Sequence, residues 1–335
     1  MKYRRLGKTN LEVSEIGLGG AGIGHAWGDI TDEECVRTVE RALELGVNFF
    51  DTSPVYGNGQ SEINLGKGIV SNRNKVVIAS KVRLRTDEHL SNISSAIRES
   101  LDNSFERLGT DYVDILQIHH QIGTDRGEYM SAVGPPPRYA YRLDQNDALQ
   151  IAEVMDELII EGKIRYKGIT AWDGDGEVIK NLLDSGRFDT AQILYNILNQ
   201  TSLVIPPDGF TDIDQGQTLK GAQQNDIGVI GIRSHAAGAL CDSLDRDVDP
   251  ESEVMRDVYK SSLIKEYRDD VFATISQIAT RFCLDNASIH TVIPGVKTIE
   301  ELEEAVFCSE MPSIPGHVMS DLDRLHQTNF IKGAP

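Results

Sequence analysis

Three side chains that can move or steer a proton follow two apolar segments near the start of the chain. Asp51 ends the segment VNFFD, Tyr56 follows it closely, and Lys81 ends the segment VVIASK. If these segments are parallel strands of one sheet, all three side chains reach the same edge of it. There the ammonium of Lys81, kept charged by Asp51, would favour phenolate and lower the pKa of Tyr56 from about 10. A phenol tuned in this way can donate or accept a proton near neutral pH, as carbonyl reduction requires.

The elements that would position these residues alternate between strand and helix, which predicts a parallel sheet with crossover helices. Eight strands and eight helices are the count of a closed (β/α)₈ barrel, an α/β fold of the TIM type. The segment from Arg4 to Val13 would add an N-terminal β-hairpin. The expected strands are apolar runs at 15–18, 48–51, 76–80, 113–118, 166–170, 190–194, 228–232 and 291–293. The expected helices lie at 32–45, 61–69, 87–107, 145–161, 175–185, 216–224, 268–285 and 298–306.

Three connections, 121–143, 201–215 and 233–262, are longer than the usual βα loop of two to six residues. Each follows a strand, so all three would be long loops on the C-terminal face, where barrel enzymes build their active sites. The segment 17–24 contains a GxGxxG pattern, but no helix start follows it. We therefore interpret it as a glycine-rich loop that approaches a ligand. Without a linker or an internal repeat, residues 1–335 are expected to form a single domain.

The composition excludes some partners. The chain of 335 residues has a formal net charge of -19, from 52 acidic and 33 basic residues. This excess of negative charge argues against nucleic acid and anionic membranes as partners. The four cysteines show neither disulfide nor zinc spacing, so free thiols are expected. With no recognisable signal peptide or membrane span, we expect a cytoplasmic protein, and the sequence does not define its number of subunits.

Four motifs occur in a fixed order along the chain. They are FDTSPVYGNGQSEINLG at 50–66, ASKV at 79–82, DYVDILQIH at 111–119 and VIPGVKTIEELEEA at 292–305. The first resembles the aldo-keto reductase signature FDTAxxYGxSExxLG, and the other three resemble further motifs of that family in the same order. The resemblance extends from about Leu6 to Ala305. It implies a barrel that binds a nicotinamide cofactor across its C-terminal face.

The resemblance assigns a catalytic tetrad to Asp51, Tyr56, Lys81 and His119. It implies that Tyr56 donates its proton to a carbonyl oxygen in reduction and takes the alcohol proton in oxidation. Lys81, held by Asp51, would tune the pKa of Tyr56, while His119 would orient the substrate oxygen. His120 is adjacent, but neighbouring strand residues point to opposite sides, and the motif selects His119.

Residues after the later strands would hold the nicotinamide end of NADP(H) or NAD(H). Thr170 and Gln192 match positions that contact the carboxamide in the family, whereas Ala171 replaces the usual Asn. Ile232 stands where an aromatic ring usually stacks on the nicotinamide. Arg233 follows it as a candidate for the cofactor pyrophosphate, a charged substrate group or a structural ion pair.

The segment after the last strand would cradle the adenosine end of the cofactor. Backbone amides from Gly295 to Thr298, just before a helix, suit a phosphate. Glu301 would repel the 2′-phosphate of NADP and could accept from a free ribose hydroxyl, whereas Lys297 would attract that phosphate. The preference between NADP and NAD is therefore left undecided.

His25, Trp27 and Trp172 lie in segments expected to form the mouth of the site, where a small carbonyl or alcohol substrate would bind. The leading interpretation is an NAD(P)-dependent oxidoreductase acting on an aldehyde, a ketone or a sugar. The alternative is a non-catalytic, cofactor-sensing regulatory subunit of the same fold, like those of potassium channels. A lyase or isomerase using an imine on Lys81 is disfavoured by its acidic and phenolic neighbours, and no metal cluster is expected.

Overall fold

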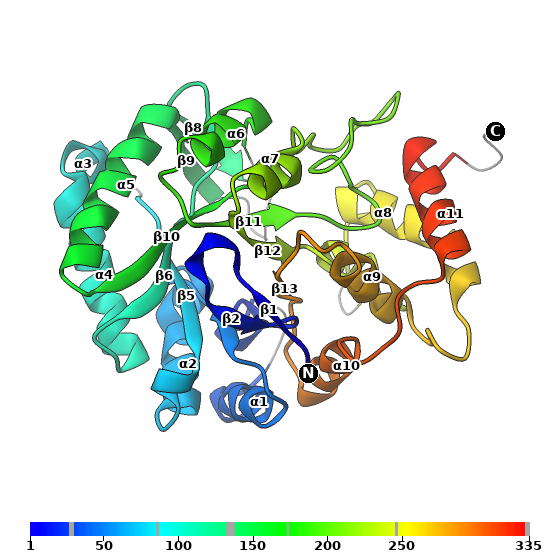
Figure 1. Ribbon diagram of the computed structural model, residues 1–335, viewed down its shortest axis with the longest axis horizontal. Helices are drawn as coiled ribbons and strands as arrows, with labels where there is room; N and C mark the ends of the chain where they lie inside the picture. The colour runs from blue at the N-terminus through cyan, green and yellow to red at the C-terminus, as the bar shows by residue number, and fades with distance from the viewer. Residues whose placement is uncertain (27–29, 85–86, 132–137, 173, 245–246, 332–335) are drawn as a thin grey trace.

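The computed structural model describes residues 1–26, 30–84, 87–131, 138–172, 174–244 and 247–331 (Figure 1). Its framework is an eight-stranded parallel sheet in the order β13-β12-β11-β10-β6-β5-β4-β3. Two isolated parallel bridges, Ile16 to Val292 and Gly19 to Gly295, join the two ends of this sheet. The amide of Gly17 also donates to the carbonyl of Val292 at 2.9 Å. The predicted (β/α)₈ barrel is therefore confirmed.

All eight expected strands are present, although the first begins later than the expected 15–18. Their bounds are β3 (Leu18–Gly19), β4 (Phe49–Asp51), β5 (Val77–Val82), β6 (Val113–Ile118), β10 (Ile164–Thr170), β11 (Thr190–Leu194), β12 (Gly228–Ile232) and β13 (Thr291–Val292). Phe49, Ile115 and Ile230 pack together with Leu6 in one buried apolar cluster. Because helices cover the other face, the strands read as continuous apolar runs in the sequence.

The crossover helices follow the strands in the expected order. They are α1 (Asp32–Glu44), α2 (Gln60–Ile69), α4 (Ile93–Leu108), α5 (Gln145–Ile160), α6 (Gly176–Asp184), α7 (Thr218–Gln224), α9 (Ile275–Leu284) and α10 (Ile299–Phe307). The helix expected at 87–107 is divided into α3 (Asp87–Ser91) and α4, because the side chain of Asn92 caps α4. Likewise, α9 begins later than expected because Thr274 caps it through a capping box with Gln277.

Several elements lie outside the barrel. The expected hairpin is formed by β1 (Tyr3–Arg5) and β2 (Glu12–Ser14), paired antiparallel. The connection 121–143, expected as a loop, instead forms a small sheet of β7 (Ile122–Gly123), β8 (Gly127–Ser131) and β9 (Arg138–Asp144). The further helices are α8 (Glu253–Ser261) and α11 (Gly316–Gln327). The 3-10 segments are η1 (Gly7–Thr9), η2 (Gly22–Gly24), η3 (Tyr56–Gly59), η4 (Arg73–Lys75), η5 (Ala236–Gly238) and η6 (Lys265–Tyr267).

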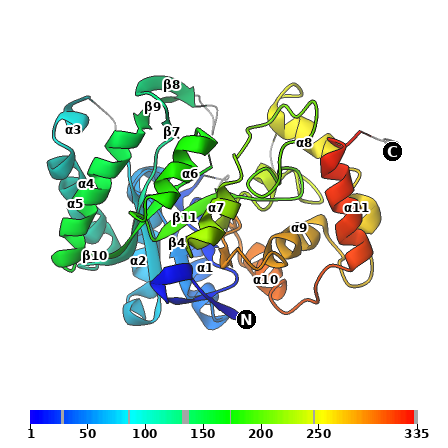
Figure 2. The same ribbon diagram turned by 45° about the horizontal axis from the view of Figure 1, so that its top comes forward.

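The additions lie on two sides of the barrel. Figure 2 shows β8 and β9 near α5 and α6, with α8 and α11 on the opposite side. β8 and β9 pair from Gly127 opposite Arg142 to Ser131 opposite Arg138, so these two parts of the connection form regular structure instead of the expected loop. Within the described ranges, no helix has the length and apolar character needed to cross a membrane.

Candidate active site

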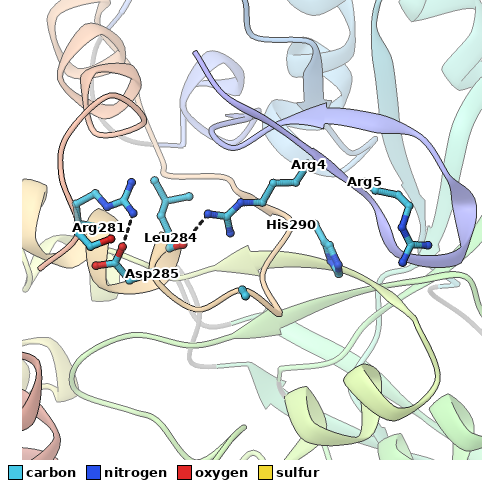
Figure 3. Close-up of a pocket in the computed structure, with 8 residues that line it drawn as sticks. Arg4, Arg5, Arg281, Leu284, Asp285 and His290 are labelled. Atoms are coloured by element: carbon cyan, nitrogen blue, oxygen red, sulfur yellow. Dashed lines mark hydrogen bonds and ion pairs between the residues drawn. The ribbon is translucent and has the colours of Figure 1, made fainter. Parts of the chain in front are cut away.

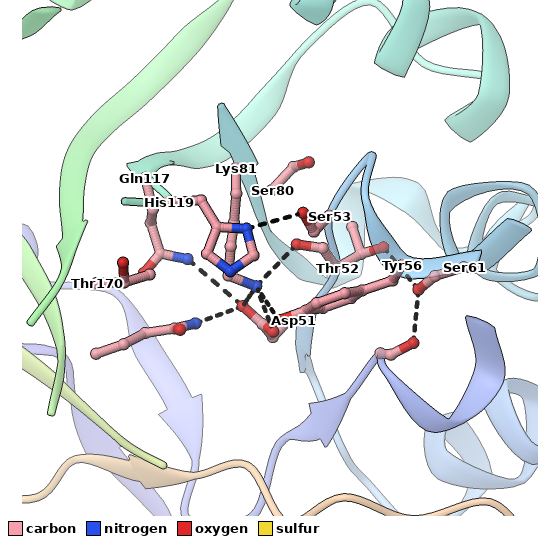
Figure 4. A network of polar contacts seen from close by, with 12 residues as sticks. Asp51, Thr52, Ser53, Tyr56, Ser61, Ser80, Lys81, Gln117, His119 and Thr170 are labelled. Carbon is pink, nitrogen blue, oxygen red and sulfur yellow. Dashed lines mark hydrogen bonds and ion pairs between the residues drawn. The ribbon is translucent and has the colours of Figure 1, made fainter. Parts of the chain in front are cut away.

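The predicted tetrad residues come together at the carboxyl ends of β4, β5 and β6 (Figure 4). Asp51 is the last residue of β4, and Tyr56 begins η3 just beyond it. Lys81 lies near the end of β5, and His119 directly follows β6. Three adjacent parallel strands therefore bring the four side chains to one edge, although they are far apart in the sequence.

Lys81 is the centre of this network. Its Nζ donates to Oδ1 and Oδ2 of Asp51 at 2.7 and 2.6 Å, to the carbonyl of Thr52 at 3.0 Å and to the hydroxyl of Tyr56 at 3.1 Å. The side chains of Lys81 and Asp51 are 0% and 3% exposed, whereas Tyr56 is partly exposed. Since an ammonium can only donate, the oxygen of Tyr56 accepts from it. The phenolic proton of Tyr56 therefore remains available for another acceptor.

The electrostatics of the pair set the resting state of the phenol. Burial raises the pKa of Tyr56 above its ordinary value, against the opposing charge of Lys81. This differs from the expectation of a lowered pKa, because the phenolate loses more hydration than the ammonium repays. Burial also acts to lower the pKa of Lys81, but the charge of Asp51 outweighs it and the net direction is upward. At neutral pH, Tyr56 is thus a protonated phenol beside a charged lysine.

The imidazole ring of His119 lies next to the phenol ring of Tyr56. Its ring meets that of Tyr56 edge-on, with centroids 5.8 Å apart and planes at 86°. Its Nδ1 lies 3.2 Å from Oγ of Ser53. Burial lowers the pKa of His119 well below its ordinary value, and the charges of Lys81 and Arg83 act in the same direction. The imidazole is therefore neutral, and a neutral imidazole can donate one hydrogen bond without carrying charge.

His120 is used differently. Its Nε2 accepts from the amide of Leu84 at 2.7 Å, and its Nδ1 lies 2.8 Å from the carbonyl of Tyr141. Burial lowers the pKa of His120 to about 4, so both contacts are those of a neutral ring. The structure therefore brings His119 to Tyr56 and uses His120 to tie two connections together.

Two glutamine side chains also donate hydrogen bonds to Asp51. The Nε2 atoms of Gln192 and Gln117 donate to its Oδ1 at 2.5 and 3.4 Å. Gln192 is the residue expected to contact the carboxamide of a cofactor, and in the structure its amide nitrogen contacts the carboxylate of Asp51. Sequence reasoning did not single out Gln117, although its place two residues before His119 on β6 puts it on the same face of the strand. Ser53 was missed as well.

Three other polar residues of the first motif, Thr52, Ser61 and Glu62, support this edge rather than face it. Oγ of Ser61 donates to the carbonyl of Gly20 at 2.7 Å and lies 2.8 Å from Oγ1 of Thr52. Glu62, completely buried, accepts from Oγ of Ser80 at 2.8 Å and from Nε of Arg107 at 2.7 Å. These contacts join α2 to β5, α4 and the loop after β3.

The candidates for the nicotinamide end of the cofactor lie in or directly after β10, β11 and β12, the next strands around the barrel. Thr170 is buried and its Oγ1 donates to the carbonyl of Ile118 at 3.0 Å. Ile232 is the last residue of β12. Arg233 has φ 60°, a left-handed conformation in which its carbonyl accepts from Nδ2 of Asn196 at 2.8 Å. Its guanidinium lies 5.5 Å from the centre of the Trp172 ring.

The segment after β13 is tied to the loop after β3. Gly295 bridges to Gly19, and a Cβ placed at Gly22 would lie 1.9 Å from the carbonyl oxygen of Val296. Within the segment, Oε2 of Glu301 accepts from the amide of Lys297 at 2.9 Å. Thr298 caps α10 by accepting from the amide of Glu301 at 3.2 Å. The residues expected to bind the adenosine end of the cofactor therefore form a hydrogen-bonded turn directly before α10.

Two buried polar atoms without a partner indicate where the phosphates of a dinucleotide could bind. Nε of Arg233 and Oγ of Ser234 are buried without a hydrogen-bond partner in the described part of the chain. Both follow β12, and both can donate to the oxygens of a phosphate. The residues at this edge of the barrel therefore fit a phosphate-bearing cofactor.

The residues expected to contact the substrate that the structure describes, His25 and Trp172, lie in different surroundings. Nε2 of His25 lies 2.8 Å from Oδ1 of Asp32, and the side chain is exposed. Trp172 lies after β10 beside Arg233, and Trp27 lies outside the described residues. Among the described residues, no group of histidine, cysteine and acidic side chains is arranged to hold a metal ion.

A hollow of about 540 Å³ at the opposite end of the barrel is not part of this site (Figure 3). It lies beside the β1–β2 hairpin and the connection between α9 and β13. The arginines that line it are already paired: Arg4 with Glu15, Arg5 with Asp226 and Arg281 with Asp285. Arg4 also donates to the carbonyl of Leu284 at 2.7 Å. These contacts hold the hairpin to the barrel, so the hollow offers no free charge to a ligand.

Comparisons with known proteins agree with this architecture. The sequence model described as Aldo/keto reductase family matches residues 15–327, and the chain belongs to that family of oxidoreductases. L-galactose dehydrogenase of Arabidopsis thaliana is 29% identical over 91% of this chain and 87% of its own. NADH-specific methylglyoxal reductase of Escherichia coli strain K12 is 27% identical over 91% of this chain and 93% of its own. The family resemblance expected from the motifs is confirmed.

Two solved structures share the fold. The holo form of an aldo-keto reductase from Bacillus halodurans superposes with a TM-score of 0.73 at 22% identity, covering 99% of both chains. An aldo-keto reductase from Klebsiella pneumoniae in complex with NADPH gives a TM-score of 0.67 at 21% identity, covering 97% of this chain and 95% of the other.

Proposed function

We propose that the protein interconverts a carbonyl compound and an alcohol with a nicotinamide cofactor, and that Tyr56 is the general acid and base. In reduction, Tyr56 donates its proton to the carbonyl oxygen, and Lys81 stabilises the phenolate that remains. In oxidation, the phenolate takes the alcohol proton. Asp51 keeps Lys81 charged and in place, and His119 orients the substrate oxygen. A bound nicotinamide supplies or accepts the hydride at the substrate carbon.

The observation that carries this proposal is the contact of 3.1 Å between Nζ of Lys81 and the hydroxyl of Tyr56. Because this hydroxyl accepts from a buried ammonium, its own proton is directed elsewhere. The partly exposed rings of Tyr56 and His119 face the same space, which suits a carbonyl oxygen placed between them.

The cofactor is NADP(H) or NAD(H). One structural neighbour was solved with NADPH, and one relative is named as NADH-specific, so these proteins do not decide between the two. Separate titrations with NADPH and NADH would decide. Binding of NADPH alone would indicate that Lys297 contacts the 2′-phosphate, and comparable NADH binding would support Glu301 on the ribose. We assign the cofactor to Thr170, Gln192, Ile232, Arg233, Gly295, Lys297, Thr298 and Glu301.

The substrate class is a small polar aldehyde, ketone or sugar. Two relatives are named for L-galactose and for methylglyoxal, both small oxygen-rich compounds. Trp172, beside Arg233 at the mouth, offers an apolar face next to a donor. We further propose that residues 1–335 act as one domain. We also propose a reducing compartment, the cytoplasm, because the four cysteines are unpaired, each buried or partly buried.

The test is Tyr56→Phe. We expect carbonyl reduction to fall about 10²–10⁴-fold while cofactor binding remains, because the variant loses only the exchangeable proton. Tyr166→Phe is the matched control, since its hydroxyl donates to the carbonyl of Thr9 at 2.8 Å, away from the tetrad. Full turnover by Tyr56→Phe would overturn the mechanism. Cofactor binding by the unaltered protein without turnover of any small aldehyde would favour a regulatory subunit instead.

A further inference from the structure

Ser53 occupies the position where the family signature FDTAxxYG has alanine. It lies between β4 and η3 and is completely buried. Its Oγ lies 3.2 Å from Nδ1 of His119, as Figure 4 shows, and also accepts from the amide of Val55 at 3.3 Å. A polar side chain at this position therefore contacts the histidine that faces Tyr56.

Counting hydrogen bonds decides which atom donates. A hydroxyl has one proton to donate and two lone pairs to accept. If Nδ1 of His119 donated to Ser53, the serine oxygen would accept twice, and its own proton would have no acceptor among the described residues. Buried polar protons are rarely left in that state. If Ser53 donates to Nδ1, every group is satisfied, and the proton of the neutral imidazole lies on Nε2.

We propose that Ser53 is a positioning residue that holds His119 in the tautomer with its proton on Nε2. Nδ1 is occupied by Ser53, and the Nε2 proton is then directed to the substrate oxygen. This inference rests on the proposed function, in which His119 orients that oxygen. The substrate oxygen would receive one hydrogen bond from His119 and one from Tyr56, and neither donor would need to reorient during the reaction.

Removing the hydroxyl releases the choice of tautomer. In Ser53→Ala, Nδ1 of His119 loses its donor, and no other described group contacts that atom. The proton can then lie on either nitrogen. Molecules with the proton on Nδ1 present a lone pair to the carbonyl oxygen, so they repel the oxygen instead of binding it.

The experiment reads the tautomer directly in the resting protein. In ¹⁵N-histidine-labelled protein, two-bond ¹⁵N–¹H correlations separate the two tautomers, and His119→Asn assigns the signal among the eight histidines. We expect the Nε2–H form in the unaltered protein, a mixed or Nδ1–H form in Ser53→Ala, and recovery in Ser53→Thr. Reduction should fall about tenfold in kcat/KM for Ser53→Ala, less than the loss of a whole oxyanion donor.

Ser80→Ala is the matched control, because Ser80 is equally buried and its hydroxyl donates to Glu62 rather than to the tetrad. It should leave both the tautomer and the rate unchanged. An Nε2–H signal that persists in Ser53→Ala would overturn the inference, whatever the rate. A changed tautomer with an unchanged rate would support the assignment of Ser53 and overturn the role of His119 in the proposed function instead.

Discussion

The ion pair between Lys81 and Asp51 contributes both to the proposed mechanism and to the stability of the fold. Asp51 accepts from Lys81, Gln117 and Gln192, and neither charge of the pair is exposed to solvent. A buried pair of this kind is costly to break from one side, because the remaining charge has no water to replace its partner.

Lys81→Met should therefore lower both stability and activity. We expect the free energy of unfolding to fall by about 3–5 kcal/mol, since Asp51 is left as an unpaired buried carboxylate. Urea unfolding followed by circular dichroism measures the change. The double variant Asp51→Asn, Lys81→Met should recover much of the stability, because no charge is left behind, but it should recover no activity. Equal destabilisation in the single and double variants would contradict this account.

The pH dependence of reduction follows from the pKa directions of Tyr56 and His119. The acid form of Tyr56 is needed, so the rate should fall only as pH rises through its pKa, which burial raises above the ordinary value. The neutral form of His119 is needed, so the rate should fall only as pH decreases through its lowered pKa. Chemistry-limited kcat should therefore be flat between about pH 6.5 and 10. A descending limb near pH 8 would show that Lys81 lowers the phenol pKa in the working complex.

At the scale of elements, the loop after β3 and the segment after β13 contact each other through glycine. A side chain at Gly22 would collide with the backbone of Val296, and backbone atoms cannot rotate away as a flexible side chain can. Both segments belong to the edge that carries the cofactor candidates, so under the proposed function their spacing sets the width of the cofactor site.

Gly22→Ala should push the two segments apart. We expect a loss of about 1–3 kcal/mol in unfolding free energy, as for other overpacked sites, and weaker cofactor binding in a fluorescence titration. Gly316→Ala is the control, because a Cβ at the start of α11 meets nothing within 4 Å. Unchanged cofactor affinity in Gly22→Ala would separate this contact from the cofactor site.

Elements with a strong apolar pattern could be predicted from the sequence, and elements without one could not. All eight barrel strands were found because they are continuous apolar runs. Helix α8 was missed because the residues it buries, Asp257 and Ser261, are polar. Strand β7 has two residues, too few for any periodicity, and β8 and β9 flank a run of prolines that suggested a loop.

The same limit applies to the site. The sequence predicted the grouping of the tetrad, because each of its residues, Asp51, Tyr56, Lys81 and His119, ends or follows an expected strand. The contacts of Ser53 could not be predicted, since they depend on the direction of one side chain across the sheet. For the same reason, the contact of Gln192 with Asp51 was not foreseen.

At the scale of the molecule, the N-terminal segment is bound to the C-terminal part of the chain at several points. The N-terminal ammonium of Met1 pairs with Glu310, and the amide of Lys2 donates to Oγ of Ser309 at 2.9 Å. The guanidinium of Arg4 donates to the carbonyl of Ile289 at 2.6 Å. These contacts lie near the junction between β3 and β13, where the barrel closes.

Residues 1–335 should therefore unfold in one cooperative step, as proposed for a single domain. The chain has two tryptophans, so in a Trp27→Phe background the fluorescence reports Trp172 alone. Its unfolding midpoint in urea should coincide with the midpoint from far-ultraviolet circular dichroism. Two separated midpoints would show that the mouth of the barrel unfolds independently of its framework.

The junction between β3 and β13 also has a consequence for biosynthesis. Ile16 and Gly19 bridge to Val292 and Gly295, which the ribosome adds only after the strands from β4 to β12 have been made. Until then, the nascent sheet has an unpaired edge, and unpaired edges invite pairing with other chains. The first barrel strand to be made is thus among the last to gain its second neighbour, and the growing chain carries an unpaired edge until β13 has been made.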